Sequence, residues 1–241
     1  YLLMSLPVLS GRATGDTARR LNQLTCLPLL VAMVGLVASA THLGNPANAL
    51  YVFTGVGRSP LSTEVFAAVI FLALAGVYWL YSFAEHPRVG LQRILLVAID
   101  VAIVAFVIAV AFAYNVDVII TWSLPLVPVS LVLNSLFGGS LLALVGFAVA
   151  GYDPGRRGMC VLLALAAAAC AANVAVYGVL GWQLQGIENE LVSAADLVAG
   201  YPAYLAAFAV LAASALALAW RAVIRRGGCR SSECQGDEGL S

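Results

Sequence analysis

Six long apolar runs, separated by short polar segments, determine which folds are open to this chain. Each run is long enough to cross the hydrocarbon core of a bilayer, which takes about 20 apolar residues in a helix. Backbone groups cannot stay unpaired in lipid, so only helices and closed barrels span it. The runs are rich in Leu, Ala and Val and lack the alternation of barrel strands. The sequence therefore predicts an all-α, polytopic transmembrane helix bundle with about six full spans, near residues 22–42, 62–84, 93–114, 124–150, 159–181 and 202–224.

The composition agrees with lipid as the main solvent of this protein. Of its 241 residues, 62% are hydrophobic and 10% are charged, whereas a soluble domain carries about 25% charged residues. Residues 1–9 resemble the last turns of an earlier apolar helix, so we expect an N-terminal helix that is clipped at its start, followed by a connector that contains Gly, Thr and Arg. Residues 1–226 then form the membrane domain, and the Gly-, Ser- and acid-rich residues 227–241 form a disordered cytoplasmic tail.

The basic residues are distributed asymmetrically along the sequence. All twelve are arginines, and all but Arg58 fall on one side of a six-span zigzag. By the positive-inside rule that side faces the cytoplasm. We therefore expect a multi-pass protein of the bacterial inner membrane whose His42 loop faces outside and whose C-terminal tail is cytoplasmic.

A polar, titratable segment separates the first two spans, with T-H-L-G-N-P at 41–46 and R-S-P-L-S-T-E at 58–64. Ionisable groups at membrane depth are costly and usually functional. A neutral imidazole at His42 can accept a proton, and Glu64 can orient it or pass the proton to water. Such a pair suits the oxidation of a hydroquinone, which loses two protons as its two electrons leave. The alternative is structural: His42 reaches the interface, Glu64 complements the helix dipole, and Ser62 is an ordinary N-terminal helix residue.

The order of these residues resembles the membrane anchor subunit of dimethyl sulfoxide reductase. In that family an H-L-G-x-P stretch ends one helix and an L-S-x-E stretch begins the next. This sequence has H-L-G-N-P at 42–46 and L-S-T-E at 61–64. The resemblance extends from the Arg12–Arg20 segment to about Trp220. A second match follows in the same order, with Tyr114-Asn115, Thr121-Trp122 and Gly138-Gly139.

The resemblance implies a quinol-oxidising anchor that carries no haem. Such subunits bind menaquinol near the outer face and pass electrons to a four-cluster iron–sulfur subunit, which feeds a molybdopterin catalytic subunit in anaerobic respiration. His42 and Glu64 then match the family's proton-handling residues, and both partner subunits dock on the outer face. The family usually has eight spans, of which this sequence lacks most of the first and the last. The residues expected around the quinol are His42, Gly44, Pro46, Ser62, Tyr114 and Trp122.

Two other functions are compatible with the sequence. The protein could be a structural anchor without a working quinol site, or a small proton-coupled transporter that uses Asp100 and His42. A transporter should have broken helices with several polar groups at the midplane, and the spans contain few Gly or Pro interruptions. We favour a structural role for Asp100, near Arg93, and interhelical hydrogen bonds for Asn134 and Asn173.

The sequence does not contain the sets of residues that bind haem, zinc or iron–sulfur clusters in other proteins. A membrane b-type haem needs two facing histidines, and the second histidine, His86, falls on the opposite side from His42. The cysteines and histidines do not cluster as zinc or iron–sulfur ligands do. The cofactor that the resemblance implies is menaquinol, and we expect no metal in this chain, which would be a quinol-oxidising or a non-catalytic subunit of an oxidoreductase.

Overall fold

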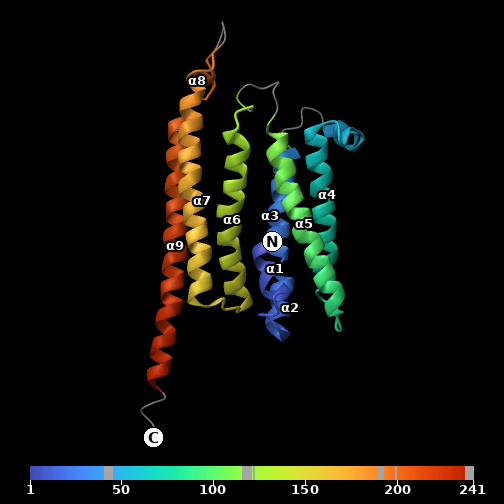
Figure 1. The fold of residues 1–241 in the computed structure, drawn as a ribbon, viewed down its shortest axis with the longest axis vertical. Helices are drawn as coiled ribbons and strands as arrows, with labels where there is room; N and C mark the ends of the chain where they lie inside the picture. Colours follow the sequence, from blue (N-terminus) through green and yellow to red (C-terminus); the bar gives the residue numbers. More distant parts are fainter. Residues whose placement is uncertain (41–45, 116–120, 122, 189–192, 199, 237–241) are drawn as a thin grey trace.

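The computed structural model is a bundle of upright helices (Figure 1). It describes residues 1–40, 46–115, 121, 123–188, 193–198 and 200–236. Within these residues, six helical segments are long and apolar enough to cross a membrane, judged by length and composition. The prediction of an all-α polytopic bundle is confirmed.

Five of these spans are single helices, and each overlaps a predicted apolar run. The other span consists of α2 (Gly15–Gln23) and α3 (Cys26–Ala40). The helix is interrupted between them, where Thr25 Oγ1 donates to the carbonyl oxygen of Asn22 at 2.6 Å. The single helices are α4 (Pro60–Tyr81), α5 (Val89–Ala113), α6 (Leu126–Ala150), α7 (Gly155–Leu184) and α9 (Tyr201–Gly236).

Helix α9 extends into the range 227–241, which the sequence predicts to be a disordered tail. The division of the protein at residue 226 stays a prediction.

The N-terminal residues form the short helix α1 (Leu2–Leu9), as predicted. The backbone then turns at Gly11, whose φ of 70° favours glycine. The following arginine-containing segment is not merely a connector, because most of it is helix α2. That helix carries Asp16 in its first turn and Arg20 in its last, and both charges complement the helix dipole.

Two buried clusters hold the bundle together. One lies between α4 and α5 and includes Phe71, Tyr78 and Leu96. The other joins α1 and α2 to α6 through Met4, Leu21, Ala143 and Phe147. Packing is close here, since a Cβ added at Gly146 would lie 2.6 Å from Met4 Cε. Small residues permit such close approach between membrane helices.

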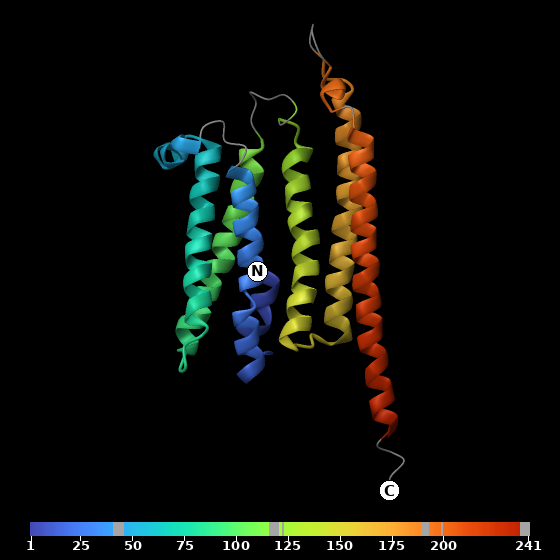
Figure 2. The same cartoon turned by 180° about the vertical axis from the view of Figure 1, so that it is seen from behind.

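Helix α9 stands at the edge of the bundle beside α7 (Figure 2). Its apolar side chains, such as Val210, Leu211 and Leu218, are mostly exposed. In a bilayer these side chains would face lipid, so α9 depends on α7 for its place in the bundle.

The two ends of the bundle differ in character. At the η1 end, the 3-10 helix η1 (Pro46–Gly55) lies against α4, and the short α8 (Ala194–Leu197) precedes α9 (Figure 1). At the opposite end lie the α1–α2, α4–α5 and α6–α7 connections. We call this the arginine end, because Arg19, Arg88, Arg93 and Arg156 lie on or beside these connections.

Candidate functional site

Glu64 is buried at the η1 end of the bundle. It lies close to the start of α4, where Ser59 is the N-cap residue and Pro60 opens the helix. Proline suits this position because its missing N–H would have no helical partner. The Glu64 side chain is 7% exposed, and its Oε2 is buried without a hydrogen-bond partner among the residues that the structure describes. A buried carboxylate oxygen of this kind costs free energy unless something binds it.

The segment before α4 is packed tightly onto the first turn of that helix. A Cβ added at Gly55, the last residue of η1, would lie 2.6 Å from Ser62 Oγ. Thr63 Oγ1 accepts from the Gly57 amide at 3.2 Å and donates to the Ser59 carbonyl at 3.0 Å. Ser62 is itself buried. These contacts fix η1 beside the turn that carries Glu64.

A pocket of about 520 Å³ opens between the start of α4 and the last turns of α5. Thr63 contributes to its wall, whereas the adjacent Glu64 is not among the described residues that line it. Ile108 and Phe112 on the α5 side are exposed, so the pocket is open toward lipid. Arg58 also lines it, at the one position where an arginine departs from the asymmetric pattern.

The predicted site residues divide into three groups. Ser62, Glu64 and Tyr114 are placed at the same end of the bundle, with Tyr114 as the C-cap residue of α5. Pro46 begins η1. His42, Gly44 and Trp122 lie outside the described residues.

The set of site residues predicted from the sequence does not include Gly55 or Arg58. Gly55 stands among ordinary loop residues, and nothing in the sequence signals its contact with Ser62. Arg58 does carry a signal, since it is the single arginine on the η1 side.

Asp100 has a different neighbour from the one expected. The Ser5 hydroxyl donates to Asp100 Oδ2 at 2.6 Å, across the contact between α1 and α5. Arg93, the neighbour expected from helical spacing, is exposed and lines a pocket at the arginine end. Within the described part of the protein, Asp100 Oδ1 is buried without a hydrogen-bond partner, and so is the nearby Tyr78 hydroxyl.

Asn134 and Asn173 form the interhelical hydrogen bonds that the sequence predicts. Asn173 Nδ2 donates to Asn134 Oδ1 at 2.8 Å, and Asn134 Nδ2 donates to the Tyr177 hydroxyl at 2.6 Å. The Tyr201 hydroxyl then donates to the Tyr177 carbonyl oxygen at 2.7 Å. This series of bonds links α6, α7 and α9.

Comparison with known proteins relates the whole arrangement to one family. The family model for the DMSO reductase anchor subunit (DmsC) matches residues 1–232. The C subunit of the anaerobic dimethyl sulfoxide reductase of Escherichia coli (strain K12) is 31% identical over 221 residues, which cover 90% of this protein and 76% of the relative.

Two further relatives agree with this match. The YnfH subunit of an anaerobic dimethyl sulfoxide reductase of Escherichia coli (strain K12) is 28% identical over 80% of this protein and 66% of its own length. The C subunit of the Haemophilus influenzae enzyme is 30% identical over 70% of this protein and 60% of its own length. The matched regions therefore span from three fifths to three quarters of the lengths of these relatives. No solved structure matches this protein.

Proposed function

Because this protein belongs to the DMSO reductase anchor subunit family, we propose that it oxidises menaquinol at the η1 end of its bundle. The electrons pass to an iron–sulfur subunit, which delivers them to a molybdopterin catalytic subunit. Both partners dock over the η1 end. As an integral membrane protein with several apolar helices, it also holds these subunits at the membrane.

The observation that carries this proposal is the buried carboxylate of Glu64. It lies at a helix end beside a surface connection, and its Oε2 lacks a partner among the described residues. Oxidation removes two electrons and two protons from the hydroquinone. His42 takes the first proton, and Glu64 assists by orienting His42 or by passing protons to water. The electrons leave toward the iron–sulfur subunit.

The surroundings of Glu64 suit a lipid-soluble substrate. The pocket between α4 and α5 is open toward lipid beside Ile108 and Phe112, which provides lateral access for a quinol. Ser62 and the tightly packed η1 lie beside Glu64. We assign Gly44, Pro46, Tyr114 and Trp122 to the same proposed site because they belong to the motifs that resemble the family.

The placement of charges supports an orientation with the η1 end outside. Arg19, Arg88, Arg93 and Arg156 belong to the opposite end of the bundle, and arginines concentrate on the cytoplasmic side of membrane proteins. The protein then resides in the bacterial inner membrane with its C-terminus in the cytoplasm.

The test is the variant His42→Ala in the assembled complex. Menaquinol-dependent reduction should fall by about 100-fold or more, the usual effect of removing a general base. Activity with an artificial dye that reduces the iron–sulfur subunit directly should be unchanged. Saturable binding of a fluorescent quinol-site inhibitor should be weakened.

Two results would count against the proposal. Normal menaquinol turnover by His42→Ala removes the histidine from the mechanism. If the native, well-folded complex binds no inhibitor at all, the protein is instead an anchor that holds its partners without a quinol site.

A further inference from the structure

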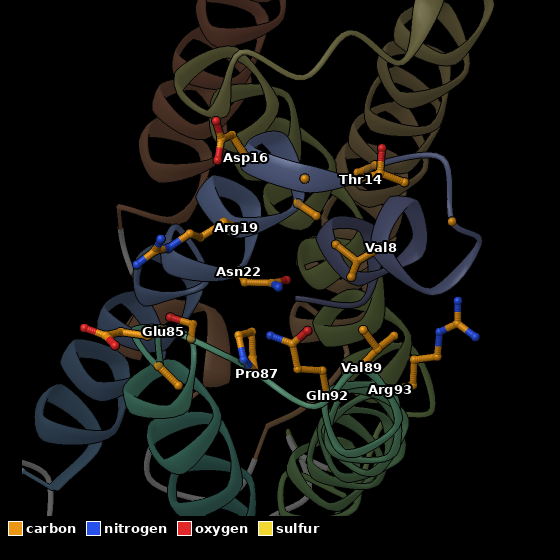
Figure 3. A pocket seen from close by; sticks show the side chains of 16 residues that line it. Val8, Thr14, Asp16, Arg19, Asn22, Glu85, Pro87, Val89, Gln92 and Arg93 are labelled. Carbon is orange, nitrogen blue, oxygen red and sulfur yellow. The ribbon is translucent and has the colours of Figure 1, made fainter.

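A second pocket lies at the arginine end of the molecule (Figure 3), whereas the proposed quinol site lies at the η1 end. It has a volume of about 400 Å³ and lies between the α1–α2 connection and the α4–α5 connection. No part of the proposed quinol chemistry uses it. Its polar side chains include Asp16, Arg19, Asn22, Glu85, Gln92 and Arg93.

Asn22 gives this pocket a buried polar group without a partner. The residue is 4% exposed and belongs to the pocket wall. Its carbonyl oxygen accepts from Thr25, but its side-chain amide forms no hydrogen bond with any residue that the structure describes. Figure 3 shows this amide reaching into the pocket toward Gln92. The residue is buried as a whole while its amide is accessible from the pocket, so the site suits a ligand with hydrogen-bonding atoms.

The charges around the pocket are balanced. Arg19 and Asp16 come from α2, Arg93 comes from α5, and Glu85 comes from the α4–α5 connection. In Figure 3 the two carboxylates and Arg19 lie on one side, and Arg93 lies on the other. Two cations and two anions favour a ligand that carries both a phosphate and an ammonium group. A purely anionic ligand would meet both carboxylates, and like charges repel.

The pocket lies at the level where lipid head groups are found. The Trp79 indole nitrogen donates to the Gln23 carbonyl at 3.0 Å, and the Tyr81 hydroxyl accepts from the Arg88 amide at 2.8 Å. Tryptophan and tyrosine mark the membrane–water interface. The wall also includes Val89, which is 61% exposed and continues onto the lipid-facing side of α5. A ligand here can place its head group in the pocket and its acyl chains along that side.

We propose that this pocket binds the zwitterionic head group of a phosphatidylethanolamine-type lipid from the adjoining leaflet. The amides of Asn22 and Gln92 would bind the phosphate, while the exposed side chains at the rim would turn inward, Arg93 to the phosphate and Asp16 or Glu85 to the ammonium group. Basic pockets between membrane helices bind the head groups of anionic lipids, and the two carboxylates of this pocket favour a zwitterionic head group instead. The same phosphate and ammonium chemistry occurs in free phosphoethanolamine, and the test separates the two sources.

The experiment measures lipid binding to the purified, delipidated complex by displacement of a fluorescent phosphatidylethanolamine. The native complex should prefer phosphatidylethanolamine over phosphatidylglycerol. Asn22→Leu, which keeps the size but not the polarity of the side chain, and Arg93→Gln should each weaken binding about tenfold. Arg157→Gln is the control, because Arg157 is exposed at the same end but does not line the pocket. Arg93 is exposed, so that variant should fold even if Asn22→Leu does not.

Three results overturn the proposal. They are equal binding by Arg93→Gln and the native complex, a preference for phosphatidylglycerol, and displacement by free phosphoethanolamine as effective as by the lipid. The last result would assign the pocket to a soluble ligand. Menaquinol turnover plays no part in this assay, so its outcome is independent of the proposed function.

Discussion

Two carboxyl groups in this protein, the half-buried Asp100 and the buried Glu64, occupy contrasting surroundings. Asp100 lies well inside α5, and the Ser5 hydroxyl of α1 donates to its Oδ2 at 2.6 Å. Glu64 lies near the start of α4, and its buried Oε2 has no partner among the described residues. Each acid keeps one oxygen that is buried without a partner in the described part of the protein, Oδ1 of Asp100 and Oε2 of Glu64. The two acids differ in their depth along a span and in the hydrogen bond that Ser5 donates to Asp100, and on these two differences we expect a packing role for Asp100 and a chemical role for Glu64.

The largest expected difference between the two acids should appear when each is replaced by its uncharged amide of the same shape. Glu64→Gln should lower menaquinol-dependent turnover by about 100-fold, because the amide cannot accept a proton. Asp100→Asn should leave turnover unchanged, since its amide oxygen can still accept from Ser5. Both are measured in the assembled complex, with dye-driven activity as the control for assembly. Equal losses in the two variants would show that the acids share one proton path and that the contrast is wrong.

Removing Ser5, the hydrogen-bond partner of Asp100, should have a smaller effect, and that effect should be on stability. Ser5→Ala removes the hydroxyl that donates to the Asp100 carboxyl group, which should destabilise the bundle by about 1–3 kcal/mol. Adding Asp100→Leu should recover most of that loss, because an apolar side chain needs no partner. Thermal unfolding of the detergent-purified protein measures both variants. If the double variant is less stable than Ser5→Ala alone, Asp100 has a further partner that matters.

The sequence could predict the spans because their signal is local. Each run contains its own apolar length, and the membrane requires helical backbone within it. Helix α2 lies where the sequence predicts a connector. Its residues are mostly polar, so no run of apolar residues marks it as a helix, and packing against α1 and α6 stabilises it.

The sequence could propose site residues only where a rare residue type falls at a span end, as at Glu64. The burial of Glu64 was not predictable, because the neighbouring Leu61 in the same turn is exposed. The Ser5–Asp100 bond joins residues 95 positions apart, so no periodicity within one helix could reveal it. The contact of Gly55 with Ser62 and the lining of the pocket around Asn22 likewise depend on how separate segments pack.

The smallest expected effect concerns the hydrogen bonds that link α7 and α9. Tyr201→Phe removes the donor to the Tyr177 carbonyl and should cost about 0.6 kcal/mol, the average for such bonds between membrane helices. Tyr204→Phe is the control, because Tyr204 is exposed on the same helix. Thermal unfolding in detergent measures both, and menaquinol turnover should not change in either.

The Tyr201→Phe variant helps to distinguish polar groups that join helices from the carboxyl group of Glu64. Loss of a hydrogen bond that only joins helices, as in Tyr201→Phe, should lower stability slightly and leave turnover unchanged. Neutralising Glu64, which we propose handles the substrate's protons, should lower turnover and change stability little. A large loss of turnover in Tyr201→Phe would mean that α9 helps to shape the quinol site. That result is not expected, because α9 packs against α7 at the edge of the bundle, away from α4 (Figure 2).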